Sequence, residues 1–203
     1  MRVAFAVAAL LGISAPALAE GMPTTIIGPG EEALAIERIP APGGEVILPT
    51  AKDKAQNHDT YHYAAVRRLG PVLHLSGVVA GRLPGEGTDA EAARAAIRRA
   101  FRTIERNLGA AGANMADIAE IRVHAAPEAR NFKGDAAALL RLYGDVKDEF
   151  VKAPYPAETY VNVASLVEPT GLMEISILAR AHGKPRGKRA DAKTEDAAET
   201  PKP

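Results

Sequence analysis

One long amphipathic helix pattern constrains the fold of this chain more than any other feature. Its apolar residues recur every three or four positions, which is the spacing of a single helix face: Ala93, Ile97, Phe101, Ile104 and Leu108. Thr88 stands three residues before Glu91, which predicts a capping box, and Gly109 and Gly112 indicate the helix end. Such a helix must bury its apolar face against another layer, so we expect a layered domain.

Strand-like segments on both sides of this helix supply that layer. The predicted strands are 33–39, 45–48, 63–69, 72–79, 118–125, 159–163 and 172–181, and a second helix is predicted over 135–150. The order predicts the α+β class, a mixed sheet with two helices packed on one face. No third helix is available for the other face, so we expect further copies of the chain to cover it.

Residues 1–19 carry the pattern of a secretory signal peptide. Arg2 provides the positive charge, residues 3–13 form an apolar run, and small residues end at Ala19, ahead of a predicted cut before Glu20. The run is shorter than the ~20 residues that a membrane-spanning helix needs. We therefore expect a periplasmic or secreted protein with no membrane insertion after cleavage.

Composition divides the rest of the chain into three parts. Residues 20–60 form a lead-in with short extended segments, and residues 61–182 form one domain. Residues 183–203 are charged, contain prolines and carry no large apolar side chain. Such a segment cannot bury enough surface to offset its ordering entropy, so we expect a disordered tail.

The overall composition excludes several classes of function. The 25 Lys and Arg residues balance the 25 Asp and Glu residues, so nothing in the net charge indicates a nucleic-acid partner. The chain has no cysteine, which excludes disulfides and thiol catalysis. It also lacks a glycine motif that could cradle a phosphate. We expect no cofactor.

Several sequence blocks, taken in order, resemble the Rid family, the RidA/YjgF-type imine and enamine deaminases. They are Tyr63, LHLSG at 73–77, NLGAAGA at 107–113 followed by MADIAEIRVHA, PYPAETYVNVASL, and LMEISILARA. The resemblance covers roughly residues 61–181. It implies a chorismate-mutase-like fold and a homotrimer with small-molecule clefts between subunits, which agrees with the uncovered sheet face.

The resemblance also assigns roles to individual residues. It makes Glu174 the catalytic glutamate that positions a water molecule, and it makes Tyr63, Ser76 and Gly77 substrate-binding residues. The family's active deaminases hold the substrate carboxylate with the arginine of a Pro-Ala-Arg motif, whereas this chain has Glu158 there. The family's helix asparagine is also missing.

Glu158 changes the expected chemistry, because a guanidinium binds a carboxylate through two parallel hydrogen bonds. A glutamate would instead repel that ligand by on the order of 4 kcal/mol at ~4 Å and an effective dielectric of about 20. Standard 2-imino acid deamination is therefore not expected. Three hypotheses remain: an enzyme for a neutral or cationic imine-type substrate with Glu174 as general base, a binding module for an amine-bearing molecule, or a structural trimer.

Plainer interpretations of the same residues stay open. From the strand pattern alone, Glu174 is an ordinary polar-face residue, Ser76 satisfies a backbone group, and Tyr63 is a packing residue. Glu158 could point to solvent or pair with Arg122 from another strand.

Three further residue groups suggest other sites, and each has an ordinary explanation. His58 and His62 have a helical metal-ligand spacing but lie among turn-forming residues, so no metal is expected. His74 and Ser76 share a strand face but run parallel to each other. The arginines opposite the apolar stripe of the first helix could bind RNA, but acidic residues among them favour a solvated helix face: Arg94, Arg98, Arg99, Arg102 and Arg106.

Overall fold

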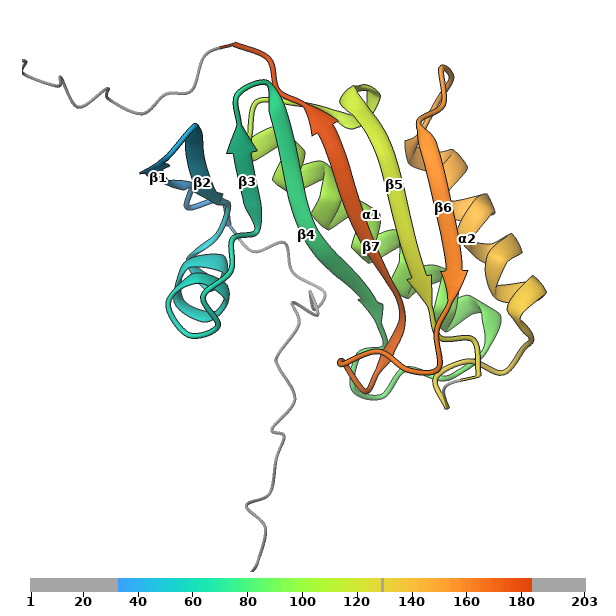
Figure 1. The fold of residues 1–203 in the computed structure, drawn as a ribbon. Coiled ribbons are helices and arrows are strands. Elements are labelled where there is room, and N and C mark those ends of the chain that lie inside the picture. Colours follow the sequence, from blue (N-terminus) through green and yellow to red (C-terminus); the bar gives the residue numbers. More distant parts are fainter. Residues whose placement is uncertain (1–32, 129, 184–203) are drawn as a thin grey trace, which may run out of the picture.

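The computed structural model of the chain describes residues 33–128 and 130–183. The predicted signal peptide and all of the predicted tail beyond Gly183 lie outside the described residues. Figure 1 shows an open sheet with two long helices against one of its faces. The predicted α+β class, a mixed sheet with two helices on one face, is confirmed.

The sheet has seven strands in the order β1-β2-β3-β4-β7-β5-β6. Their bounds are β1 (Glu37–Ala41), β2 (Gly44–Leu48), β3 (Val66–Leu69), β4 (Val72–Gly81), β5 (Ile118–Ala125), β6 (Ala157–Asn162) and β7 (Gly171–Arg180). Neighbouring strands are antiparallel, except that β5 and β6 run parallel. A parallel pair needs a crossover, and the second helix, α2 (Ala136–Phe150), provides it.

The predicted first helix is α1 (Ala90–Ala110), and its apolar face packs on the sheet. Four of its large apolar side chains are fully buried: Ile97, Phe101, Ile104 and Leu108. Phe101 stacks on Phe150 of α2 with ring centroids 5.4 Å apart, and its centroid lies 6.0 Å from that of Tyr143. One apolar core therefore joins both helices to the sheet. Among the described helices, none is long and apolar enough to cross a membrane.

The predicted cap of α1 is wrong by one residue. The N-cap is Asp89, whose side chain accepts a hydrogen bond of 2.9 Å from the backbone N–H of Ala92, so Thr88 and Glu91 form no capping box. At the other end the helix runs through Gly109 to Ala110, and Gly112, with φ of 77°, follows it. Aspartate and threonine both cap helices, so local preference could not decide between adjacent candidates.

Replacing Asp89 with alanine is expected to lower the free energy of unfolding by about 1 kcal/mol, because the first turn of α1 loses its side-chain acceptor. Thr88→Ala is the matched control and should change it by less than about 0.5 kcal/mol. Urea unfolding of the two variants measures both values. A larger loss for Thr88→Ala than for Asp89→Ala would contradict the cap assignment.

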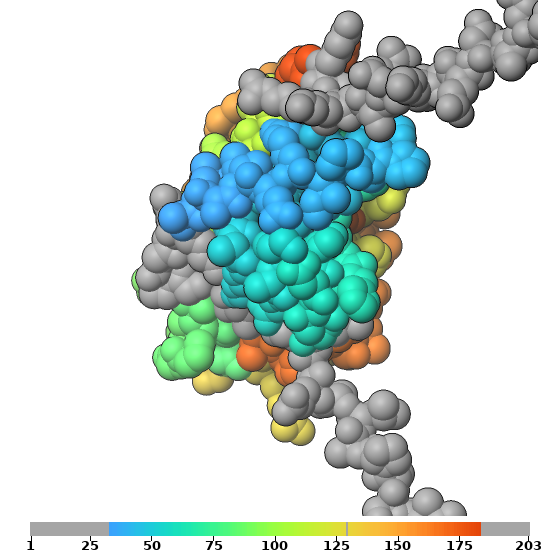
Figure 2. Space-filling view, turned by 90° about the vertical axis from the view of Figure 1, so that its left-hand side faces the viewer, coloured from blue at the N-terminus to red at the C-terminus, as the bar shows by residue number. Residues whose placement is uncertain are grey.

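The segment before residue 61 contributes more than short extended pieces. β1 and β2 form a hairpin, and β2 pairs with β3, so both strands belong to the same sheet. A short π-helix, η1 (Asp53–His58), follows and was not predicted. Figure 2 shows the hairpin and η1 side by side on one face of the molecule. Asp53 and Asn57 of η1 are only 2% and 3% exposed.

The chain returns from η1 to the sheet through a loop that was predicted as strand. β3 begins at Val66 rather than at residue 63. The backbone N–H of Tyr63 donates to the carbonyl of Asn57, and His62 has a positive φ of 58°. The backbone of Tyr63 is therefore bonded to η1, whereas the carbonyls of Ala64 and Ala65 accept hydrogen bonds from Ser76 of β4.

An ion pair anchors the loop between β4 and α1. Arg99 of α1 binds Glu86 through two hydrogen bonds of 2.7 Å each. Burial alone would raise the pKa of Glu86, but the hydrogen bonds from Arg99 and the Leu83 N–H, together with the charges of Arg99 and Arg82, lower it overall. The ionised form of Glu86 is therefore favoured in the folded protein.

This ion pair predicts a pH-dependent contribution to stability. A carboxyl group whose folded pKa is lowered stabilises the fold above its unfolded pKa and loses that contribution as pH falls through the folded value. Glu86→Gln should therefore destabilise the protein by about 1–2 kcal/mol at pH 7 and by progressively less below pH ~4.5. Thermal unfolding across this range measures the difference, and Glu105→Gln is the control. A Glu86→Gln difference that does not shrink in acid would contradict the prediction.

Candidate functional site

The candidate site is centred on a bulge in β4. Leu75 pairs with Ile177 and Val78 with Ile175, so β4 carries one extra residue between these pairs. Ser76 and Gly77 occupy this bulge. A bulge re-aims the side chains of its strand, and bulges are common next to functional sites.

Gly77 permits a close approach of Glu174 to the β4 backbone. Glu174 lies on β7, where it alternates with the buried Met173 and Ile175 and therefore belongs to the sheet face without helices. A Cβ atom at position 77 would lie 1.9 Å from Glu174 Oε1. Only glycine leaves room for the carboxylate in this position.

Tyr63 is held by a chain of hydrogen bonds from η1. Its hydroxyl donates to Asn57 Oδ1 at 2.8 Å, and Asn57 Nδ2 donates to Asp53 Oδ1 at 2.9 Å. Asp53 Oδ2 in turn accepts from the Thr50 hydroxyl at 2.8 Å. Burial raises the pKa of Tyr63, and the nearby charges of Asp53 and Glu174 raise it further. The phenol therefore stays neutral.

The hydroxyl of Ser76 donates its proton to an intramolecular hydrogen bond. Its Oγ donates to the backbone carbonyl of Ala64 at 2.6 Å, and its backbone N–H donates to Ala65. These bonds tie the bulge to the loop that carries Tyr63. They also agree with the interpretation that Ser76 satisfies a backbone group. Ser76 makes no hydrogen bond with His74.

A small hollow lies beside the bulge. Its walls come from η1, the loop at Tyr63, β4 and α1, and its polar side chains include Asn57, Ser76 and Asn107. The free volume is about 20 Å³, whereas one water molecule needs ~10–15 Å³. The hollow of a single chain thus holds one water molecule or a group of that size.

Glu158 lies apart from these residues within one chain. It is on β6, separated from β7 by β5, and it binds residues of α2 on the helix-covered face. Its carboxylate accepts from the Tyr143 hydroxyl at 2.6 Å and from Lys147 Nζ at 2.5 Å. Burial and then the hydrogen bond to Glu158 raise the pKa of Tyr143. Arg122 binds Glu120 instead of Glu158.

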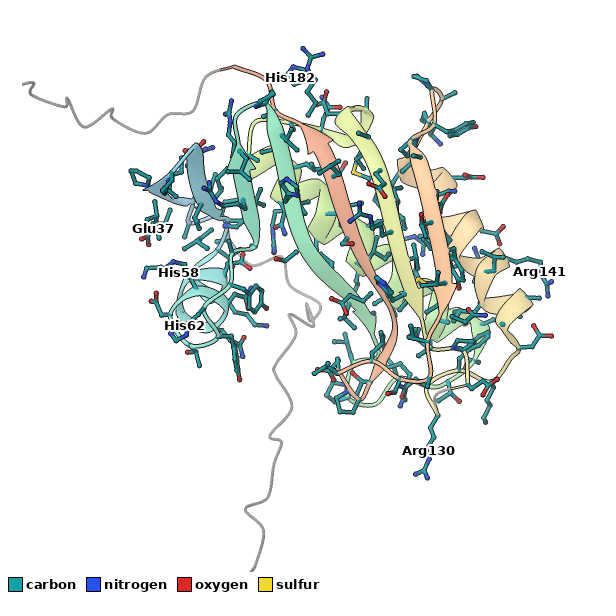
Figure 3. The ribbon with its side chains drawn as sticks, viewed as in Figure 1. Glu37, His58, His62, Arg130, Arg141 and His182 are labelled. Atoms are coloured by element: carbon teal, nitrogen blue, oxygen red, sulfur yellow. The ribbon has the colours of Figure 1, made fainter. Side chains whose placement is uncertain are left out.

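The histidines do not assemble a metal site in the part of the chain that the structure describes. No group of three or more His, Cys, Asp or Glu side chains lies close enough to hold an ion there. His58 Nδ1 pairs with Asp59 Oδ1 at 2.8 Å. Figure 3 places His58 and His62 at the η1 end of the molecule.

In the described part of the chain, four arginines of the first helix make ion pairs, and one of them is Arg106, which lies 3.8 Å from Asp53 of η1. Arg94 binds Asp145 and Arg98 binds Glu149, both on α2, and Arg99 binds Glu86. Acidic neighbours thus neutralise part of the positive charge of these arginines. The absence of a nucleic-acid partner stays a prediction.

Comparison with known proteins identifies the family. A family model described as Endoribonuclease L-PSP matches residues 54–181. The chain belongs to this family. No significant match was found among curated proteins. The matched residues include Tyr63, the bulge, Glu158 and Glu174, so every site residue that the sequence analysis singled out lies within the family region.

Several solved structures are similar to this chain. Protein YJGH is 24% identical with a TM-score of 0.54, and the match covers 68% of this chain and 97% of YJGH. A Mycobacterium tuberculosis member of the YjgF/YER057c/UK114 family is 27% identical (TM-score 0.49, coverage 63% and 93%). RidA from Psychrobacter sp. PAMC 21119 is 21% identical (TM-score 0.47, coverage 58% and 87%). The likeness to YJGH shows the fold.

The structure adds polar residues to the site that the sequence analysis missed. Asp53, Asn57, Thr103 and Asn107 line the hollow and are each less than 5% exposed. Asp53 and Asn57 lie four residues apart in a polar stretch that was interpreted as lead-in. Their four-residue spacing was the signal that the sequence offered. The polar composition of a segment, however, does not indicate that its residues are buried.

Proposed function

We propose that this protein is an exported member of its family whose cleft, built around the β4 bulge, binds or hydrolyses a small amine- or imine-type metabolite. The observation that carries the proposal is the placement of the Glu174 carboxylate directly against Gly77, which lines the same hollow as Tyr63. Family membership supports a general family function for this cleft.

Standard 2-imino acid deamination is not the proposed activity, because residue 158 offers no guanidinium for a substrate carboxylate. Lys147 lies 2.5 Å from Glu158 and offsets part of its negative charge. The repulsion of an anionic ligand is therefore smaller than for a bare glutamate, but the two parallel hydrogen bonds of an arginine remain absent.

In this proposal, Glu174 acts as the general base for hydrolysis of an imine. A water molecule adds its oxygen to the imine carbon and transfers a proton to the carboxylate, which acts as general base. The protonated Glu174 gives this proton to the nitrogen, which leaves a carbinolamine. The carboxylate then takes the proton of the carbinolamine hydroxyl and passes it to the nitrogen, so the C–N bond breaks as the C=O bond forms, and ammonia and a carbonyl compound leave.

Assembly and location are part of the same proposal. None of the helices that the structure describes lies over the face of the sheet that carries Glu174, and a homotrimer would cover this face and place the clefts between subunits. The signal-peptide pattern of residues 1–19 supports a periplasmic or secreted location. Light scattering of the mature chain tests the trimer, and N-terminal sequencing of exported protein tests the cut before Glu20.

The proposed function is tested by ammonia release from freshly generated 2-imino acids and from neutral imines. We expect the mature protein, residues 20–203, to be inactive on the anionic substrates. In the proposed trimer, residue 158 would serve the cleft of a neighbouring subunit. The double variant Lys147→Gln/Glu158→Arg should therefore gain activity on the anionic substrates, since it supplies a guanidinium without a neighbouring lysine. Lys147→Gln alone is the control.

Each outcome separates the alternatives. Turnover of 2-imino acids by the native protein would contradict the charge argument and indicate a retained standard deaminase. Turnover of a neutral imine that Glu174→Gln abolishes would support the enzyme. Saturable binding without turnover would favour the binding module, and neither binding nor turnover would favour a structural trimer.

A further inference from the structure

A second cavity lies at the end of the molecule where α1 ends, and it shares no lining residue with the hollow at the bulge. Its walls come from the start of β1, from β3, from the C-terminal end of α1 and from the residues that follow β7. The free volume is about 590 Å³, within the ~300–1,000 Å³ that small-molecule sites occupy. Figure 3 labels His182, which lines this cavity, well apart from His58 and His62 at the η1 end.

The charged side chains that line this cavity are basic. They are Arg38, Arg68 and His182, and none of the acidic residues that the structure describes is part of the wall. Glu45 is fully buried next to the two arginines: its Oε1 accepts from Arg38 Nη1 at 2.9 Å and lies 3.8 Å from Arg68 Nη1. His182 binds Asp117 through Nε2. Two guanidinium groups against one glutamate therefore leave a positive charge at the cavity.

Both guanidinium groups keep N–H donors for a ligand. A guanidinium has five such donors. Arg38 uses two of them, for Glu45 and for the carbonyl of Ala110, and Arg68 uses two for backbone carbonyls. Each arginine thus keeps three N–H donors that bond to none of the described residues. The carbonyl oxygens of residues 108–110, which end α1 and would attract a cation, already accept hydrogen bonds.

We propose that this cavity binds a small molecule that carries a carboxylate or a phosphate group. The anionic oxygens accept from the remaining N–H groups of Arg38 and Arg68, because the planar fork of a guanidinium matches both kinds of group. Arg68 is only 3% exposed, so the fold holds it in place before a ligand arrives. Ile36 and Ala111 add an apolar part of the wall that suits a hydrocarbon body. The site does not depend on the cleft proposed above.

Four probes with one aromatic ring each separate charge from bulk. Benzoate and phenyl phosphate are anions, benzamide is neutral, and benzylammonium is a cation. In a titration of the mature protein followed by amide NMR signals, the anions should shift Gly109 and Gly112 saturably and leave Gly77 in place. Benzamide should bind about tenfold more weakly, since it makes no charge-assisted bond, and benzylammonium should shift neither signal. The tighter of the two anions identifies the preferred group.

Two variants assign the contacts. Arg38→Gln should weaken binding of the tighter anion by about tenfold or more, because it removes charge-assisted donors. Arg102→Gln removes an exposed arginine of α1 outside the cavity and should leave the affinity unchanged. Gly109→Leu should fill the cavity and abolish binding with the fold intact, since a Cβ atom there meets nothing within 4 Å. It tests the site even if Arg38→Gln is unstable.

The proposal is overturned if neither anion shifts Gly109 and Gly112 saturably, or if benzamide or benzylammonium binds as tightly as the anions. Anion binding that survives Gly109→Leu, or that shifts Gly77 instead, would overturn it as well. None of these outcomes bears on the cleft at the β4 bulge, whose test is ammonia release.

Discussion

Replacing Gly77 with alanine should disable the cleft while leaving the protein folded. The new Cβ atom would lie 1.9 Å from Glu174 Oε1 and 2.6 Å from Glu174 Cδ, far inside van der Waals contact. These atoms are the end of a flexible side chain, so the carboxylate can move away at small cost in stability. A displaced general base typically costs ~100-fold or more in turnover, and we expect binding of an amine-type ligand to fall at least tenfold.

The measurement combines ligand titration or ammonia release with thermal unfolding of the same preparation. Gly144→Ala is the matched control, since a Cβ atom there meets nothing within 4 Å and the residue lies inside α2. It should keep full activity and gain about 0.5–1 kcal/mol of stability. Full activity of Gly77→Ala would show that Glu174 does not act from its observed position.

Phe101→Ala should cause the largest loss of stability, about 3–5 kcal/mol. Phe101 is 0% exposed and packs between α1 and α2, where its ring lies 5.4 Å from Phe150 and 6.0 Å from Tyr143. Its removal leaves a cavity at the junction of both helices and the sheet. The midpoint of urea unfolding should fall strongly, with little change in its slope.

Val167→Ala is the control for this loss, because Val167 is 69% exposed. Its effect should stay within about 0.5 kcal/mol. A Phe101→Ala variant that is no less stable than Val167→Ala would contradict the assignment of Phe101 to the core.

The helices and most strands followed from periodicity in the sequence. The stripe from Ala93 to Leu108 predicted α1 because burial of one helix face imposes its spacing on the residues. The ends of elements were less predictable. Thr88 and Asp89 are both good caps, and the choice of Asp89 depends on where the first turn of α1 meets the sheet and the loop before it.

The site was only partly predictable for a related reason. The family resemblance singled out Tyr63, Ser76, Gly77 and Glu174, and the structure brings these four together at one bulge. It did not indicate that Glu158 binds Lys147 and Tyr143 on the other face of the sheet. A strand residue faces one side or the other by register, and register is set by pairing with distant strands.

The sequence by itself determined the class of fold and the chemical groups available to the cleft, because both are carried by local patterns and by residue types. The tertiary structure alone decided which way each polar group donates. The proton of Tyr63 points to Asn57 because Asp53, ten residues earlier in the chain, orients that amide. Hydrogen-bond direction depends on the partners that folding assembles, and no local pattern in the sequence encodes those partners.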